Sequence, residues 1–203
     1  MKLSFKEPST RSFMKFLFAP LIINFIIELC SRRNLNDTFG YIFGSPLVFL
    51  YNSLIILATL SVVLLFKRRT FFFTLITTVW IGFGITNGII LSNRVTPFTA
   101  TDLTLADLGL GIISKYLSKT TTTIIATFLI LVVLGIVFLF FKGPKYKGKL
   151  NYKKNVLIVA SVWVFLLLST KTALGFNIIA SYFGNIAFAY QDYGFPYCFS
   201  NTL

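Results

Sequence analysis

The chain has 203 residues, of which 56% are apolar and only 12% are charged, whereas about a quarter of the residues of a soluble domain are charged. Its mean hydropathy is +0.80. The 24 Phe, 9 Tyr and 2 Trp residues are more than one core of this size could hide from water. These numbers exclude an ordinary soluble domain and indicate a surface that faces lipid.

The charge balance is strongly basic, with 19 Lys and Arg against 6 Asp and Glu, which gives a net charge of +13. Such an excess is typical of proteins that bind nucleic acid or an anionic membrane surface. A nucleic-acid binder would spread its bases over one polar face, but here they cluster in short runs between long apolar stretches. We therefore expect membrane lipids as partners and no nucleic acid.

Five apolar segments are each long enough to cross a hydrocarbon core of about 30 Å at a rise of about 1.5 Å per residue. They are continuously apolar, which favours helices over the alternating strands of a barrel. The sequence therefore predicts an all-α integral membrane protein with a five-helix transmembrane domain over residues 1–176. The predicted spans are 13–30, 46–66, 70–91, 120–141 and 156–176.

The first span carries polar residues at helical spacing, with Asn24, Glu28 and Arg32 four residues apart. A carboxylate inside a membrane is costly unless it is paired, so we expect an ion pair between Glu28 and Arg32 or Arg33. The group is either a polar lining for a lipid headgroup or a self-satisfied pair at a helix end, and we favour the pair. The span has no cleavage site of small residues, so we interpret it as uncleaved.

The third span contains Gly84 and Gly88 in the pattern of small residues four apart, beside Asn87. This pattern is typical of close helix packing rather than of a pore. We expect Asn87 to form a hydrogen bond with a neighbouring helix.

The distribution of basic residues predicts the orientation, because loops on the cytoplasmic side carry an excess of Lys and Arg. With the N-terminus in the cytoplasm, 13 bases lie inside and six lie outside, together with five of the six acids. The inside bases are Lys2, Lys6, Arg11, Lys15, Lys67, Arg68, Arg69, Lys142, Lys145, Lys147, Lys149, Lys153 and Lys154, and the outside bases are Arg32, Arg33, Arg94, Lys115, Lys119 and Lys171.

The outer loop over residues 92–119 begins with an interruption at Pro97, which cannot continue a helix. Thr104 and Asp107 then have the spacing of a capping box. Beyond them apolar residues recur on one face, which predicts an amphipathic helix in the outer interface. The members of this face are Leu105, Leu108, Ile112, Ile113 and Tyr116.

A second outer segment follows the last span, over residues 177–203. Apolar side chains from Ile178 to Ile186 recur at helical spacing, and the aromatic-rich run that follows suits the headgroup level of a membrane. Gly194 and Pro196 indicate a turn. We expect an interfacial segment that begins a linker to an extracellular domain absent from this sequence.

No catalytic residue is predicted. The chain has no His, and its few acids are scattered singly, so neither a metal cluster nor a His-based triad can be assembled. No glycine-rich phosphate-binding loop is present. Cys30 and Cys198 both lie toward the outer side, but two cysteines carry little information and we do not expect a disulfide.

Two runs carry a resemblance to a known family. Residues 87–103 read NGIILSNRVTPFTATDL, and residues 189–199 read AYQDYGFPYCF. Together with five spans and an N-terminus inside, they resemble the membrane part of the lipoteichoic acid synthase family. Those proteins are bacterial phosphoglycerol transferases with a five-helix N-terminal domain and an extracellular sulfatase-like domain. The resemblance covers essentially the whole chain.

The resemblance implies a place in the plasma membrane of a Gram-positive bacterium and a part in cell-wall biogenesis. In the family, an extracellular Thr nucleophile and a divalent metal, commonly manganese, transfer phosphoglycerol from phosphatidylglycerol. None of those motif positions lies in this sequence, so we carry over no catalytic residue and expect no cofactor in the chain. The implied function is that of a membrane-anchoring and lipid-presenting module, not catalytic by itself, for a phosphoglycerol transferase.

Outward cations at the interface are the natural contacts for an anionic lipid headgroup. Arg94 is the first candidate and Lys171 the second. Asp102 could accept hydrogen bonds from glycerol hydroxyls, or it could pair with Arg94 and hold the loop. The headgroup and structural roles of Arg94 stay equally open, whereas for Lys171 simple snorkelling toward the interface is favoured.

Two alternatives belong to other classes. A small transporter would show internal repeats and charges at the membrane midplane, and the sequence shows neither. A stand-alone structural or regulatory membrane protein could oligomerise through the face of Gly84 and Gly88.

Overall fold

The computed structural model describes residues 10–105, 119–146, 148 and 150–202. Within these ranges the chain consists of helices joined by turns and has no strand, as the all-α prediction requires. The elements in chain order are α1 (Thr10–Arg32), α2 (Leu35–Gly44), α3 (Pro46–Ser61), the 3-10 helix η1 (Val62–Leu65), α4 (Arg69–Leu91), α5 (Ala100–Thr104), α7 (Lys119–Lys142), α8 (Tyr152–Gly175), α9 (Ile186–Tyr193) and α10 (Phe195–Ser200).

Three helical stretches in the described part of the chain are long and apolar enough to cross a membrane. They are Pro46–Leu65, Arg69–Leu91 and Tyr152–Gly175, which coincide with the second, third and fifth predicted spans. Helices α1 and α7 have 23 and 24 residues and cover the first and fourth predicted spans.

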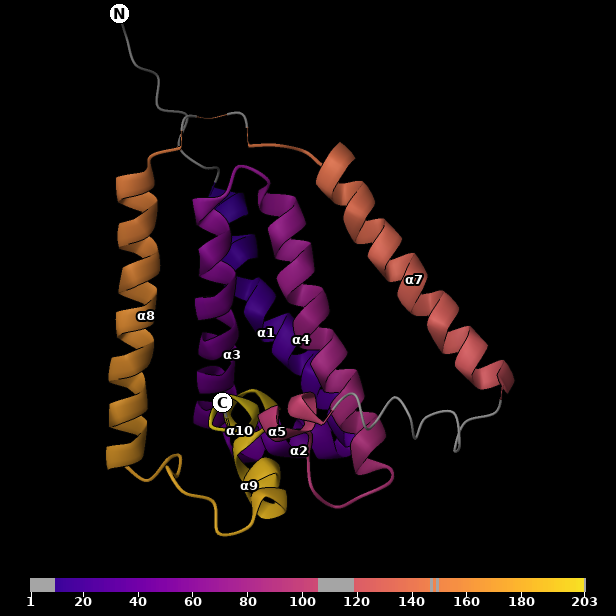
Figure 1. Ribbon diagram of the computed structural model, residues 1–203. Coiled ribbons are helices and arrows are strands. Elements are labelled where there is room, and N and C mark those ends of the chain that lie inside the picture. Colours follow the sequence, from indigo (N-terminus) through magenta and orange to yellow (C-terminus); the bar gives the residue numbers. More distant parts are fainter. Residues whose placement is uncertain (1–9, 106–118, 147, 149, 203) are drawn as a thin grey trace, which may run out of the picture.

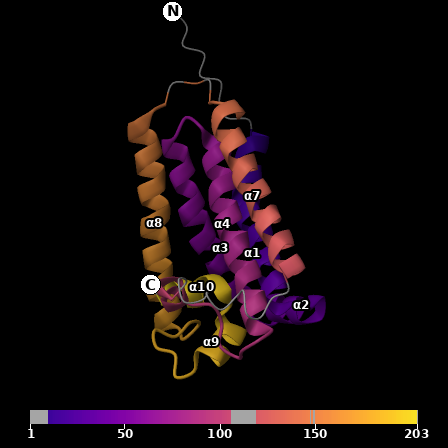
Figure 2. The ribbon, with the colours of Figure 1, turned by 45° about the vertical axis from the view of Figure 1, so that its right-hand side comes forward.

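The long helices lie side by side and run between the same two ends of the molecule (Figures 1 and 2). Helix α1 packs closely against α4 and α3, whereas α8 lies against α3 and η1. Helix α7 packs on α4 and, in Figure 1, leans away from the other helices toward its N-terminal end. The bundle therefore has α1, α3 and α4 at its centre and α7 and α8 at its flanks.

One end of the bundle carries the short helices α2, α5, α9 and α10 (Figure 1). Asparagine side chains start two of them: Asn34 accepts a hydrogen bond from the backbone N–H of Asn36 at 2.9 Å, and Asn185 accepts one from Ala187 at 2.9 Å. These are N-caps, which satisfy donors that a helix start leaves open. We term this end the capped end.

The opposite end carries basic turns. The backbone N–H of Tyr146 donates to the carbonyl of Lys67 at 2.8 Å. The guanidinium groups of Arg68 and Arg69 lie 4.3 and 4.1 Å from the ring centres of Phe140 and Tyr146. The bases that the sequence assigns to two separate inside loops are therefore brought together here. We term this the basic end.

Three details differ from the sequence predictions. Helix α2 was not predicted, although Asn34 and the acidic Asp37 in its first turn are start signals. Residues 178–185 form turns rather than the predicted helix, and α9 begins only at Ile186. The residue before Ile178, Asn177, has a φ of 55° in the left-handed region just beyond the end of α8, whereas Asn185 is extended and caps α9.

The structure also has a helix start that was not predicted. A capping box is formed by Thr99 and Asp102, five residues before the predicted pair of Thr104 and Asp107, and the short helix α5 ends at Thr104. The remainder of the predicted interfacial helix, over residues 106–118, lies outside the described residues. Arg94 also binds the capping acid Asp102.

The core continues from the long helices into the capped end. Ile27, Ile56 and Leu60 are fully buried in the bundle, and Phe195 and Phe199 of α10 belong to the same cluster. The C-terminal segment is therefore packed into the bundle. Large apolar side chains remain exposed along α8, among them Leu157, Val164, Phe165, Leu167 and Leu168, as expected for a lipid-facing helix.

Candidate functional site

The first candidate headgroup residue, Arg94, lies just beyond the end of α4 and is held by its own loop. Its Nη2 atom donates to Asp102 Oδ2 at 2.6 Å and to the carbonyl of Pro97 at 3.1 Å, and its Nε atom donates to the carbonyl of Thr96 at 3.0 Å. The Arg94 side chain is 42% exposed. No described hydrogen bond uses Nη1, so one edge of the guanidinium remains open to a ligand.

The second member of this pair, Asp102, accepts hydrogen bonds from three groups. Besides Arg94, the backbone N–H and the hydroxyl of Thr99 donate to Asp102 Oδ2 at 2.8 and 2.9 Å. Burial alone would raise the pKa of Asp102, but the hydrogen bonds from Arg94 and Thr99 outweigh it and hold the pKa below its usual value. Asp102 is therefore an ionised clamp that fixes the direction of Arg94.

The loop of Arg94 is attached both to α4 and to the C-terminal segment. The backbone N–H of Phe98 donates to Asn87 Oδ1 at 2.7 Å, so Asn87 binds this loop rather than the neighbouring helix that we expected. The ring of Phe98 stacks on Phe199 at 5.6 Å, and the N–H of Ala100 donates to Thr202 Oγ1 at 3.1 Å. The two runs that carry the family resemblance, about 100 residues apart in the chain, thus lie against each other.

The C-terminal helix α10 is attached through buried polar side chains of the long helices. Glu28 Oε1 in α1 accepts the N–H of Phe195 at 2.7 Å, and Asn52 Oδ1 in α3 accepts the N–H of Tyr197 at 2.7 Å. Both side chains are fully buried. They satisfy open donors at the start of α10 and, in Glu28, place a negative group where a helix favours one.

This attachment requires glycine at position 194. Gly194 has a φ of 75°, in the left-handed region, and a Cβ atom there would overlap the hydroxyl of Tyr41 and lie 2.8 Å from Asn52 Nδ2 and from Glu28 Oε1. Asn52 Nδ2 also donates to the carbonyl of Tyr193 at 2.7 Å. The turn between α9 and α10 is therefore inserted directly among these polar groups.

Glu28 and Arg32 form the expected ion pair, with 3.0 Å between Oε2 and Nε. Arg32 does more than neutralise the carboxylate, because its Nη2 atom donates to the carbonyl of Gln191 at 3.0 Å. Its guanidinium also lies 4.1 Å from the ring centre of Tyr41. The pair therefore binds the C-terminal segment to α1, and its polar atoms point into protein contacts rather than toward a lipid.

Gly84 and Gly88 lie where α4 meets α1. A Cβ on Gly84 would lie 3.0 Å from the Cα of Ile27, and one on Gly88 would overlap the carbonyl oxygen of Cys30. The absent side chains allow the two backbones to approach closely. This face is covered by α1 of the same chain, so it offers no free surface for a second copy.

Lys171, the second headgroup candidate, is exposed near the C-terminal end of α8 and is separate from the Arg94 loop. It forms no ion pair with any described residue.

Cys30 and Cys198 are not joined by a disulfide. Cys198 is buried, and that burial raises the pKa of its thiol, which leaves it protonated and unreactive.

The described residues of the capped end form no group that could hold a metal ion. Among the described residues no three His, Cys, Asp or Glu side chains come together. The carboxylates of Glu28 and Asp102 are each engaged by an arginine and by backbone N–H groups.

Sequence reasoning missed Asn52, Tyr41 and Tyr197 as members of this site. A signal existed for Asn52, because an amide in the middle of an apolar span needs a partner.

Burial raises the pKa of Tyr197 to about 12, and Tyr51 adds to the shift. The Tyr197 hydroxyl therefore stays protonated and donates to the carbonyl of Ala180 at 2.8 Å. Nothing in the local pattern of an aromatic run singles out that contact.

No family model, no curated protein and no solved structure matches this chain. The features that bear on function are the geometry of the capped end and the apolar character of the long helices.

Proposed function

We propose that the chain is the membrane-anchoring and lipid-presenting module of a lipoteichoic acid synthase-like phosphoglycerol transferase that uses phosphatidylglycerol. In this proposal five helices span the plasma membrane of a bacterium, the basic end lies in the cytoplasm and the capped end faces outward. The module itself performs no chemistry. Its partner is an extracellular catalytic domain, to which any manganese belongs.

The observation that carries the proposal is the junction of the two resemblance runs. Arg94 presents the open edge of its guanidinium, Asp102 fixes that side chain, and Ala100 in the same loop binds Thr202. A headgroup phosphate bound at Arg94 would lie beside the segment that ends α10. Guanidinium groups bind phosphate with strong, directional hydrogen bonds, so this loop could hold a lipid headgroup next to a following domain.

The rigid attachment of α10 supports the same function. Glu28 and Asn52 bind the start of α10 from two different long helices. A domain that followed such a helix would be held at a fixed position relative to the membrane helices and to Arg94. A flexible tether would not need two fully buried polar acceptors, which are costly to place in a membrane protein.

The proposal is tested by the response of the detergent-solubilised protein to short-chain phosphatidylglycerol, with phosphatidylcholine as reference. A lipid that binds the folded state raises the melting temperature with its concentration. We expect a larger rise with phosphatidylglycerol, and Arg94→Ala should weaken that response by about tenfold, as loss of a charge-assisted contact predicts. Arg33→Ala, which removes an exposed charge at the same end, is the matched control.

A second variant separates the two roles of Arg94. Asp102→Asn keeps the arginine charge but removes the ion pair that orients it, so it should weaken the phosphatidylglycerol response less than Arg94→Ala does if Arg94 contacts the headgroup. Equal responses of the wild type to the two lipids, or equal effects of Arg94→Ala and Arg33→Ala, would contradict the proposed function. Membrane insertion of each variant is checked from its amount in the membrane fraction.

A further inference from the structure

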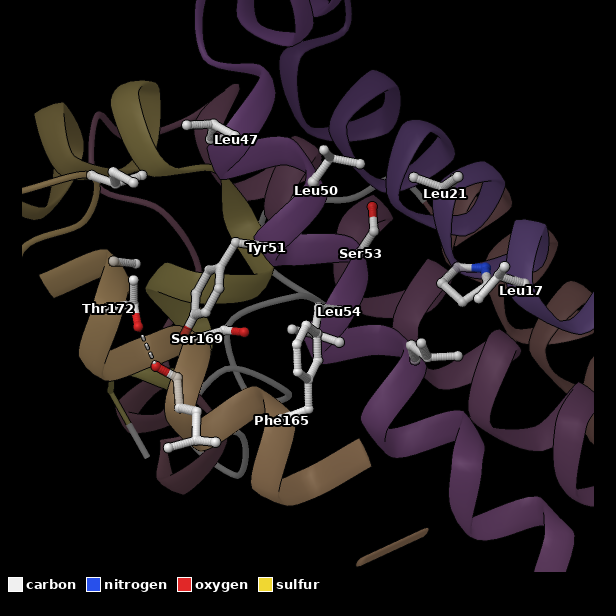
Figure 3. A pocket seen from close by; sticks show the side chains of 15 residues that line it. Leu17, Leu21, Leu47, Leu50, Tyr51, Ser53, Leu54, Phe165, Ser169 and Thr172 are labelled. Carbon is white, nitrogen blue, oxygen red and sulfur yellow. Dashed lines mark hydrogen bonds between the residues drawn. The ribbon is translucent and has the colours of Figure 1, made fainter. Parts of the chain in front are cut away.

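An apolar groove runs along the bundle between α1, α3 and α8, with a volume of about 660 Å³ (Figure 3). Helices α1 and α8 both pack on α3, and the groove lies over α3 between them. In Figure 3, Leu17 and Leu21 approach from α1, Leu50 and Leu54 from α3, and Phe165 from α8. We term this the α3 groove. Its lining includes no residue of the Arg94 loop, and it adjoins α10 through Tyr51, whose ring packs edge-on against Tyr197 at 5.5 Å.

The lining of the α3 groove contains no charged residue. Most of the hydroxyl groups that reach it are already engaged in the protein: Ser53 donates to the carbonyl of Phe49 at 2.9 Å, Thr172 donates to the carbonyl of Leu168 at 2.9 Å, and Tyr51 shares a hydrogen bond with Thr170 at 2.7 Å. A polar ligand would lose its hydration here without gaining partners. The part of a ligand that enters the groove must therefore be apolar.

The groove extends from the capped end to the middle of the bundle. On α3 its lining runs from Leu47, next to the first residue of the helix, to Leu57, which is about 15 Å along a helix axis. This is about half of a hydrocarbon core of roughly 30 Å. The groove therefore matches the depth of one leaflet, that of the capped end.

The size of the groove restricts its occupant. The groove offers about 660 Å³. This space has room for a single hydrocarbon chain lying along α3.

A cation stands beside the outer part of the groove. Lys171 precedes Thr172 on α8 and lies one helical turn beyond Leu168, both of which line the groove, so Lys171 and Leu168 are neighbours on the helix surface. Lys171 is exposed and forms no ion pair within the described ranges. An anionic group at the head of an apolar chain in the groove would meet this ammonium group.

From this arrangement we infer that the α3 groove binds one acyl chain of an anionic phospholipid from the leaflet of the capped end, with the lipid phosphate at Lys171. The inference rests on the proposed function, because it requires the bundle to be embedded in a bilayer, and it assigns a site to the lipid tail. In this arrangement Lys171 binds the lipid phosphate, whereas a lysine that only snorkels toward the interface would bind no particular lipid.

The test is lipid retention by the full chain, purified in detergent with phosphatidylglycerol and phosphatidylcholine of equal chain length and measured by native mass spectrometry. Leu168→Trp fills the groove, whereas Leu167→Trp places the same side chain on the adjacent lipid-facing position; the native residues are 58% and 61% exposed. We expect Leu168→Trp to lower retention of both lipids by about tenfold, since several methylene contacts are lost, and Leu167→Trp to leave retention unchanged. Leu50→Trp, from the floor of the groove, should repeat the loss if Leu168→Trp folds poorly.

The headgroup contact is tested in the same measurement. Lys171→Gln should reduce the preference for phosphatidylglycerol over phosphatidylcholine and leave the retention of phosphatidylcholine unchanged, whereas Lys153→Gln, at the other end of α8, should change neither. Equal retention by Leu168→Trp and Leu167→Trp would overturn the groove even if the wild type prefers phosphatidylglycerol and the proposed function stands. A third outcome is that Leu168→Trp loses both lipids while the wild type shows no preference between them. That result would support the acyl-chain site, but it would contradict both the binding of the lipid phosphate by Lys171 and the proposed function.

Discussion

At the scale of single residues, Asp102 performs three tasks with one carboxylate. It pairs with Arg94, it accepts the N–H of Thr99 at the start of α5, and it accepts the Thr99 hydroxyl. Because all three donors reach the same oxygen, the direction of Arg94 and the start of α5 depend on each other. A change at Asp102 should therefore alter the loop as a unit.

The low pKa of Asp102 predicts a pH dependence of stability. A carboxyl whose pKa is lowered by folding contributes stability above its unfolded-state pKa, and that contribution is lost as the pH falls through its folded-state pKa. We therefore expect Asp102→Asn to melt a few degrees below the wild type at pH 7, and the difference to shrink as the pH falls below the usual pKa range of an aspartate. Thermal melts of both proteins across this pH range measure the effect.

The difference between the two melting temperatures is the informative quantity, because all other carboxyl groups titrate in both proteins. Asp192→Asn, which removes another exposed carboxyl at the capped end, is a suitable control. A gap between wild type and Asp102→Asn that stayed constant as the pH fell would show that the ionised carboxylate does not stabilise this loop.

Of the two contacts that Glu28 makes, one could be predicted from the sequence and the other could not. The spacing of four residues predicted the pair with Arg32, and the structure has it at 3.0 Å. The other partner, the N–H of Phe195, lies 167 residues away in the chain. A backbone N–H has no distinctive side chain, so no sequence pattern could indicate which one a buried carboxylate would accept.

At the scale of elements, the contact between α1 and α4 requires glycine at position 88 of α4 but not at position 82 of the same helix. A Cβ at Gly88 would overlap the Cys30 carbonyl, whereas one at Gly82 would have nothing within 4 Å. Overpacking a tight contact costs about 1–3 kcal/mol, while Gly→Ala in an open helical position gains up to about 1 kcal/mol.

We therefore expect Gly88→Ala to lower the free energy of unfolding by about 1–3 kcal/mol, and Gly82→Ala to leave it unchanged or to raise it slightly. Unfolding of the purified protein in mixed micelles, followed by circular dichroism against the fraction of denaturing detergent, measures both variants. If the two alanine variants were equally stable, close approach of α1 and α4 at Gly88 would not be a feature of the folded protein.

Helix ends at this scale were predicted least well, for a local reason. The pair Thr99–Asp102 has the same spacing and chemistry as the predicted pair Thr104–Asp107, but the sequence pattern did not single it out. The structure forms a capping box at Thr99 and Asp102, and Asp102 also binds Arg94. The contact with Arg94 thus supports a helix start that residue spacing alone did not reveal.

At the scale of the whole molecule, the long helices separate a basic end from a capped end. The basic end gathers Lys67 and Arg68 with the turn at Tyr146. Because basic loops remain in the cytoplasm, we expect the capped end to face outward. This orientation places Arg94, Lys171 and α10 on the outer side.

The orientation is tested with single cysteines in a protein with Cys30→Ser and Cys198→Ser. Ser92→Cys, exposed at the capped end, should react with a membrane-impermeant maleimide on intact cells, whereas Lys145→Cys, exposed at the basic end, should react only after permeabilisation. The native residues at both positions are exposed, so burial does not bias the comparison. The opposite pattern of labelling would reverse the assignment of the two ends.

The sequence by itself determined the helical class, the positions of the long apolar helices to within a few residues and the pair of Glu28 and Arg32. Each of these follows from composition or from contacts within one or two helical turns, which residue spacing records directly. Only the tertiary structure decided that α10 is bound by Glu28 and Asn52, that Asn87 holds the Arg94 loop, and that a groove opens over α3. These features join backbone groups and helix faces far apart in the chain, and such partners are selected by packing rather than by any local pattern.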